Sequence, residues 1–270
     1  MNKIEMTFST HLGEANQETI NQWEMIASRR ALVNLSNLLR TYHEYHLLVE
    51  QIDNADWNDL TAIRKVLLDV RTALYGEKME QLIRLQHEYA NQEIKKYLVD
   101  SHGEFKEVRV RATVKGISAT DFLAWQTNSM TKVMTGSPEE RRTYTIKDVF
   151  VAHPEHYATP VGFAVLETLG GIPTLVKLGR PETVPDIVSN ARDTEITTHW
   201  HTGSIHMADG TLWGYGLMEY QDKDYGCDMV YHVFWPAMAP QIFFDDHARH
   251  LAVEHRNFIL NATEWIQNKA

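Results

Sequence analysis

Residues 245–258 read DDHARHLAVEHRNF, and this stretch decides how the C-terminal part of the chain is interpreted. Apolar side chains recur through it and beyond it at steps of three and four residues, which places them on one face of a helix. These side chains are Phe244, Ala248, Leu251, Phe258, Ala262 and Trp265. His247, His250 and Glu254 lie beside that apolar stripe. Because His250 and Glu254 are four residues apart, they share one face of the predicted helix and can reach the same point.

The sequence before this helix is typical of β-strands. From residue 105 apolar and polar side chains alternate, as in a strand with one buried face; Val108 and Val110 belong to the apolar set, Arg109 and Arg111 to the polar set. Later strand-like runs, separated by turn signals, cover residues 143–151, 161–169, 172–178, 194–207, 211–221 and 227–235. We therefore predict an α+β helix-grip fold, in which a curved antiparallel sheet wraps a helix over residues 240–267 and leaves a cavity between them.

Two shorter signals complete this prediction. Ser118 and Asp121 have the spacing of a helix cap and predict a helix after the first strand of the C-terminal region. Pro240 can open the final helix, because the first turn of a helix does not need its amide hydrogen.

The first hundred residues have the spacing of helices. Residues 16–100 carry apolar stripes that favour three helical segments, the second capped by Asp56 and interrupted at Gly76. We expect a helical N-terminal region over residues 1–103 and a helix-grip domain over residues 104–270. The stripes need partners, so we expect these helices to pack on the outside of the sheet or against another copy of the chain in a homo-oligomer.

The composition excludes several classes of protein. The chain has 270 residues, 43% apolar and 23% charged, which is ordinary for a globular protein. A net charge of −10 argues against binding to nucleic acid or to an anionic membrane. The single Cys227 excludes an intrachain disulfide and a cysteine-based zinc site. Since the N-terminus has no apolar signal segment and MVYHVFWPAMAPQIFF (229–244) is too short to span a bilayer, we predict a cytoplasmic protein.

A carboxylate lies within one of the predicted strands. Glu167, in the strand 161–169, shares a face with Phe163 and Val165. If this face points inward, Glu167 is a carboxylate in an apolar wall and needs a cation, a metal or a hydrogen-bond donor. If the face of Leu166 points inward instead, Glu167 is solvated. The sequence leaves both orientations open.

Histidines are concentrated in the second half of the chain. Nine of the 14 follow residue 150, at positions 153, 156, 199, 201, 206, 232, 247, 250 and 255. HPEHY (153–157) precedes the Glu167 strand, whereas His199 and His201 form a rival pair on one strand face. His250 and Glu254 can also form a partly exposed pair at the rim of the fold. Two histidines and two carboxylates with an open position suit zinc, with manganese or iron as alternatives.

Four segments resemble the phloretin hydrolase and diacetylphloroglucinol hydrolase family. They are HPEHY, VLETLGG (165–171), CDMVYHVFWP (227–236) and HLAVEHRNF (250–258). The likeness covers roughly residues 105–260 and does not extend to residues 16–100. Members of that family are metal-dependent enzymes with a Bet v 1-like fold, and they hydrolyse the carbon–carbon bond between a phenolic ring and an acyl group.

The resemblance implies a zinc site made of two histidines and two glutamates. It places the first ligand at His156, with His153 as the second choice, and the others at Glu167, His250 and Glu254. If His156 is not the ligand, the His199 and His201 pair is a further possibility.

The leading functional hypothesis is a metal-dependent hydrolase that cleaves a carbon–carbon bond in an acylated phenol or a related β-dicarbonyl compound. His232, Tyr157 and Tyr231 are the candidates for donating a proton to the departing ring carbon. The alternative is a non-catalytic protein that binds an apolar or aromatic small molecule in the cavity. A third hypothesis is a helix-rich dimer whose C-terminal domain has lost the chemistry.

Overall fold

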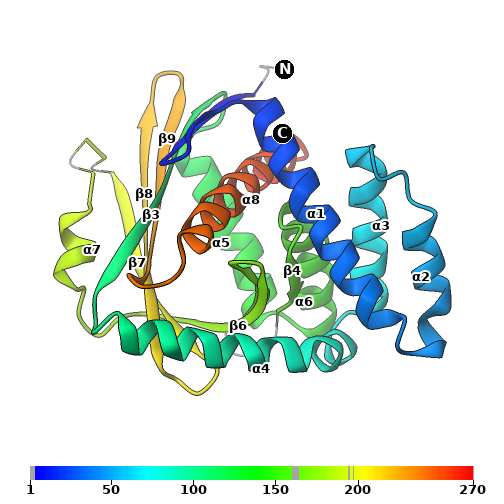
Figure 1. Ribbon diagram of the computed structural model, residues 1–270. Coiled ribbons are helices and arrows are strands. Elements are labelled where there is room, and N and C mark those ends of the chain that lie inside the picture. The colour runs from blue at the N-terminus through cyan, green and yellow to red at the C-terminus, as the bar shows by residue number, and fades with distance from the viewer. Residues whose placement is uncertain (1–3, 160–163, 194, 197, 270) are drawn as a thin grey trace.

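The computed structural model describes residues 4–159, 164–193, 195–196 and 198–269 (Figure 1). The N-terminal elements are β1 (Glu5–Thr10), β2 (Gly13–Ala15), α1 (Gln17–Leu39), η1 (His43–Tyr45), α2 (His46–Asp53), α3 (Leu60–Ala73) and α4 (Glu77–Asp100). Next come β3 (Phe105–Lys115), α5 (Ala119–Thr135), α6 (Pro138–Tyr144) and the π-helical η2 (Thr145–Phe150). The remaining elements are β4 (His156–Ala158), β5 (Ala164–Leu169), β6 (Ile172–Gly179), α7 (Asp186–Asn190), β7 (His199–Met207), β8 (Leu212–Lys223), β9 (Gly226–Pro236) and α8 (Gln241–Gln267).

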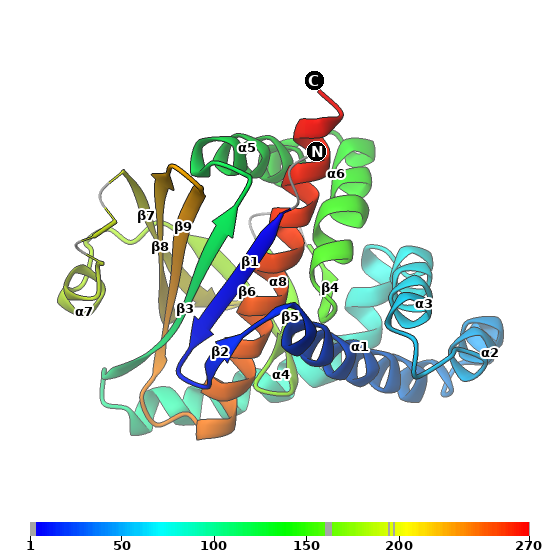
Figure 2. The ribbon, with the colours of Figure 1, turned by 90° about the horizontal axis from the view of Figure 1, so that it is seen from above.

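Nine strands of the described chain form one sheet in the order β2-β1-β3-β9-β8-β7-β6-β5-β4. Every neighbouring pair in it is antiparallel. The sheet bends around α8, so that β3, β9 and β8 lie on one side of the helix and β5 and β4 on the other (Figure 2). An antiparallel sheet with a long C-terminal helix is thus confirmed. No helix among the described residues has the length and apolar character needed to cross a membrane.

The main core lies between the sheet and α8. The predicted alternation in β3 is confirmed, because Val108 and Val110 are fully buried in this core together with Ala248 of α8. Helix α5 also contacts α8, where the rings of Trp125 and Phe258 lie 5.5 Å apart. Burying each large apolar side chain stabilises the fold by about 1.5–3 kcal/mol. Residues 105–115 and α8 therefore fix each other's orientation.

Helix boundaries follow local capping. The Ser118 side chain accepts a hydrogen bond from the Asp121 amide and caps α5 as predicted. Asp59, rather than the predicted Asp56, caps α3 by accepting from the Thr61 amide. Gly76 separates α3 from α4 with a φ of 85°, a left-handed backbone that favours glycine.

One predicted strand is wrong, and the three strands β1, β2 and β4 were missed. Residues 143–151 form the end of α6 and the whole of η2 instead of a strand. The cause is a capping box between Ser137 and Glu140, with Pro138 at the first helical position, which commits the following residues to a helix. The missed strands β1 and β2 carry mostly polar side chains; β1 pairs with β3 at the edge of the sheet. Residues 161–163, Phe163 among them, and residues 194 and 197 of the predicted strands lie outside the described residues.

The N-terminal helices pack on the outer face of the sheet. Apolar side chains of α1, α2, α3 and α4 form a second core with Tyr157, Ala158 and Leu166 of β4 and β5. The other face of β5, which carries Val165, packs against the core around α8. This is the first of the two arrangements expected for the helices. The division into domains at residues 103 and 104 stays a prediction, although β1 and β2 join the sheet from the N-terminal side of it.

Candidate metal centre

The HPEHY segment is held in place by an arginine from the N-terminal helices. Arg71 of α3 is buried and donates hydrogen bonds to the backbone carbonyls of Phe150 at 2.6 Å, His153 at 2.6 Å and His156 at 2.9 Å. Burial lowers the pKa of Arg71 to about 9. Sequence reasoning missed this residue, because an arginine beside the apolar stripe of a helix usually faces water.

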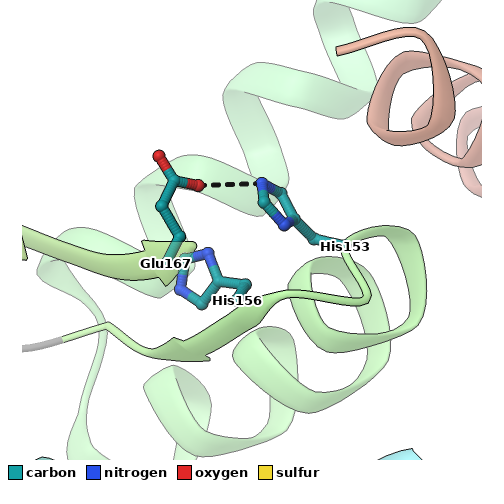
Figure 3. Close-up of side chains that lie close together, drawn as sticks. All are labelled: His153, His156 and Glu167. Carbon is teal, nitrogen blue, oxygen red and sulfur yellow. Dashed lines mark ion pairs between the residues drawn. The ribbon is translucent and has the colours of Figure 1, made fainter. Parts of the chain in front are cut away.

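Four side chains from three segments converge beside this loop. The Nε2 atom of His153 lies 3.0 Å from Oε2 of Glu167 and 3.6 Å from Oε1 of Glu254. The Nε2 atom of His250 lies 3.6 Å from the same Glu167 oxygen. Figure 3 shows the His153 and Glu167 side chains pointing toward one another, with His156 beside Glu167. Loop, strand and helix thus each supply part of one cluster.

The spacing of these atoms fits a metal ion. Ligand atoms at zinc distances in a tetrahedron are separated by roughly 3.4 Å. The three separations in the cluster, 3.0, 3.6 and 3.6 Å, lie on both sides of that value. Two overlapping sets of side chains could hold a metal ion, one made of His153, His156 and Glu167 and the other of His153, His250 and Glu254.

His153 and His156 have different surroundings. His153 belongs to both sets and contacts both glutamates. The Nε2 atom of His156 shares a hydrogen bond of 2.8 Å with the Thr159 hydroxyl. Burial, and next the charge on His153, lower the pKa of His156 to about 3. The geometry therefore favours His153, the second choice of the sequence prediction, as the histidine ligand from this loop.

The pKa shifts in the cluster place the positive charge of His250 beside two glutamates. Burial alone would raise the pKa of Glu167, but hydrogen bonds from His153 and His250 hold it well below its usual range. Burial would lower the pKa of His250, but the hydrogen bond and charge of Glu167 raise it to about 9. For Glu254 burial dominates and raises the pKa. A cation between the two glutamates would relieve the cost of keeping Glu254 ionised.

The turns of α8 on either side of the cluster carry two further histidines. Both nitrogens of His247 and of His255 are buried, with no hydrogen-bond partner in the described part of the protein. The ring of His247 stacks on His250 with centroids 5.3 Å apart, and His255 stacks on Tyr231. The Tyr220 hydroxyl is also buried, beside the side chains of Gln126 and Tyr231. Buried polar atoms such as the ring nitrogens of His247 and His255 are normally paired, so we expect water or a ligand to bind to them between the sheet and α8.

The predicted proton donors do not gather at one point. Tyr231 points toward α8, on the same side of the sheet as Glu254. Tyr157 points away from α8 into the second core, where its hydroxyl bonds to Thr168. The exposed pair His199 and His201 belongs to neither metal-type set found among the described residues.

His232 lies on the face of the sheet that points away from α8. Its two ring nitrogens contact the carboxylates of Glu107 and Glu219. Glu219 also accepts hydrogen bonds from the Asp193 amide at 3.2 and 2.9 Å. The next residue with the same orientation, Phe234, packs with Val188 of α7. His232 therefore links the sheet to the α7 segment and does not reach the cluster.

Replacing His232 should therefore affect stability and not metal content. His232→Leu leaves the buried Glu219 without its histidine partner, and we expect a loss of about 2–4 kcal/mol in the free energy of unfolding. Urea unfolding measures the loss, and elemental analysis of the folded variant should show an unchanged metal content. A variant that keeps its stability and loses its metal would contradict this placement.

Comparison with known proteins adds no family assignment, because no family model matches the chain and no curated protein is significantly similar to it.

Proposed function

We propose that the protein is a metal-dependent hydrolase that cleaves the bond between a phenolic ring carbon, or the equivalent carbon of a β-dicarbonyl compound, and an acyl group. The observation that carries the proposal is the convergence of His153, Glu167, His250 and Glu254 in a buried cluster. Two histidines and two glutamates suit zinc, with manganese or iron as alternatives. A metal ion bound there would supply Lewis-acid polarisation of the acyl carbonyl.

The fold supports the same proposal. A curved sheet around one long helix agrees with a helix-grip, Bet v 1-like architecture, which we propose as the class of this chain. Such a fold places the substrate between sheet and helix, where the side chains of Tyr231 and Tyr220 lie. Burial raises the pKa of Tyr231 well above its usual range, so its hydroxyl stays protonated and able to donate.

The reaction consumes one water molecule. The ring carbon receives a proton as its bond to the acyl carbon breaks, and the acyl group leaves as a carboxylic acid. The neutral imidazoles of His247 and His255 can each accept one hydrogen bond and donate another. Burial lowers the pKa of His247 to about 3 and that of His255 well below its usual range, so both stay neutral at pH 7. They are therefore suited to orient phenolic hydroxyls or water.

Turnover of an acylated phenol tests the proposal. Metal-loaded wild type should convert phloretin or diacetylphloroglucinol to a deacylated ring and a free acid, measured by chromatography. Glu167→Gln should slow the reaction by at least about 100-fold, since carbonyl polarisation is worth several kcal/mol.

Glu88→Gln is the matched control, because Glu88 lies on the surface of α4 and pairs with Arg84 there. It should leave the rate unchanged. A metal-loaded wild type no faster than Glu167→Gln on both compounds would contradict the proposed reaction.

The second candidate function is a binding protein for an aromatic small molecule. The ring nitrogens of His247 and His255, which have no partner among the described residues, favour it, because a bound ligand would satisfy them without any reaction. Tight binding of an acylated phenol with no release of acid by the metal-loaded protein would select this alternative.

A further inference from the structure

A cleft lies between α1 and α8, on the side of α8 that faces the N-terminal helices. Its volume is about 420 Å³, within the range of small-molecule sites in proteins. Its lining consists of Trp23, Ile26, Ala27, Arg30, Glu155, Asp246, Arg249, His250 and Val253. His250 belongs to this lining and to the candidate metal centre. The cleft therefore reaches one of the proposed metal ligands from outside the space between the sheet and α8.

One part of the lining is apolar. Trp23 and Ile26 of α1 face Val253 of α8 across the cleft. Ile26 is 59% exposed, a high value for an isoleucine in a cleft. A ligand with an apolar body would cover this side chain and gain the free energy of removing it from water.

The two arginines of the lining differ in their partners. Arg30 donates hydrogen bonds to Glu155 at 2.6 and 2.5 Å and to Asp246 at 3.0 and 2.9 Å. Burial would lower the pKa of Arg30, but the bonds and charges of Glu155 and Asp246 raise it. Its guanidinium is thus neutralised by two carboxylates and has little affinity for a third.

Arg249 has no such partner. Its guanidinium makes no hydrogen bond or ion pair with any residue in the described ranges, although it is half-buried in the wall of the cleft. Asp245, one turn earlier on the same helix, feels the charge of Arg249, but its hydrogen bonds are to His11 at 2.8 Å and Gln241 at 2.6 Å. A guanidinium presents paired donors that match a carboxylate. The cleft therefore combines an apolar wall with one guanidinium that has no hydrogen-bonded counter-ion in the described part of the chain.

We propose that this cleft binds an amphipathic carboxylic acid, with its carboxylate on Arg249 and its apolar part against Trp23 and Val253. Combined with the proposed hydrolysis, this binding defines the substrate as an acylated phenol or β-dicarbonyl compound that also carries a carboxylate. This last statement rests on the proposed function, whereas the binding of the acid does not.

Calorimetric titration of the full-length, metal-free protein tests the binding. The probes are 3-phenylpropanoate and its neutral amide, which have the same shape and differ in charge. The acid should bind at least about tenfold more tightly than the amide, because a hydrogen bond from the guanidinium to a charged oxygen is stronger than one to a neutral amide oxygen. Arg249→Met should remove this preference and leave the affinity for the amide within about twofold.

Two further variants locate the site. Arg84→Met removes the same charge from the surface of α4 and should change neither affinity. Ala27→Phe fills the cleft and should weaken both ligands. Equal affinity for acid and amide, no binding of the acid, an unchanged acid preference in Arg249→Met, or unchanged binding in Ala27→Phe would each overturn the proposal.

The outcomes separate this proposal from the proposed function. An acid-selective cleft in a protein that hydrolyses no acylated phenol would support the cleft and contradict the hydrolase. Hydrolysis of an acylated phenol by a protein that shows no acid-selective binding would support the hydrolase and contradict the proposed cleft.

Discussion

Wild-type protein grown with added zinc is expected to retain one divalent metal ion per chain after dialysis, and Glu167→Gln is expected to lose it. The amide keeps the size of the carboxylate but cannot supply its charge to the metal or to His250. Since even residues that only support a metal ligand change metal affinity by about 10- to 100-fold, the loss at Glu167 should exceed about 100-fold. Elemental analysis of untagged protein measures the metal content.

The same experiment distinguishes the two histidines of HPEHY. His153→Ala should lose the metal, because His153 contacts both Glu167 and Glu254. His156→Ala should retain most of it, because the contact that His156 makes through Nε2 is to Thr159. His250→Ala should behave like His153→Ala.

The bound metal should also stabilise the fold. At a free concentration of one hundred times its dissociation constant, a ligand that binds the folded state adds about 2.7 kcal/mol to the free energy of unfolding. That increment should be present in the Glu88→Gln control and absent in Glu167→Gln. A wild type without metal, or variants that all keep it, would rule out this centre.

The fold was predictable where the information was local. Val108 and Val110 identify the buried face of β3 by alternation, and α8 is evident from its apolar stripe. His250 and Glu254 could be paired for the same reason, because four residues along a helix fix their relative direction. None of these inferences requires knowledge of a distant contact.

The orientation of Glu167 could not be predicted, because both faces of β5 are covered. Leu166 packs against the N-terminal helices, and Val165 packs toward α8. A strand buried on both sides loses the alternation that would show which face is inward. The choice between His153 and His156 depends in the same way on Arg71, which lies some eighty residues earlier in the chain.

The orientations of Glu219 and His232 depend on pairing between strands. His232 pairs with Arg109 of β3, whose neighbours Val108 and Val110 point inward, so His232 points outward. Residues an even number of positions apart in a regular strand point to the same face, so Trp213 and Glu219 of β8 would be expected on one face. The pairing of β8 with β7 is irregular opposite Ile205 and His206, and this reverses the direction of the side chains. Trp213 therefore lies in the main core, whereas Glu219 does not. One extra residue in a strand has this effect, and the sequence carries no clear sign of it.

Glu24→Gln is expected to destabilise the protein by about 3–5 kcal/mol. Glu24 of α1 is 1% exposed and accepts hydrogen bonds from Arg64 of α3 and from Arg256 of α8, which is itself 1% exposed. Removing the carboxylate charge leaves the Arg256 guanidinium in the interior without a counter-ion, a change that typically costs this much. Burial already lowers the pKa of Arg256. Urea unfolding measures the effect.

The exposed pair of Arg84 and Glu88 provides the matched control, and Glu88→Gln should cost less than about 1 kcal/mol. A double variant, Glu24→Gln with Arg256→Met, removes the buried cation as well and should recover part of the lost stability. If the double variant is no more stable than Glu24→Gln, the unpaired guanidinium is not the cause. Recovery would show that the buried carboxylate of Glu24 helps to join the N-terminal helices to α8, the helix that carries His250 and Glu254.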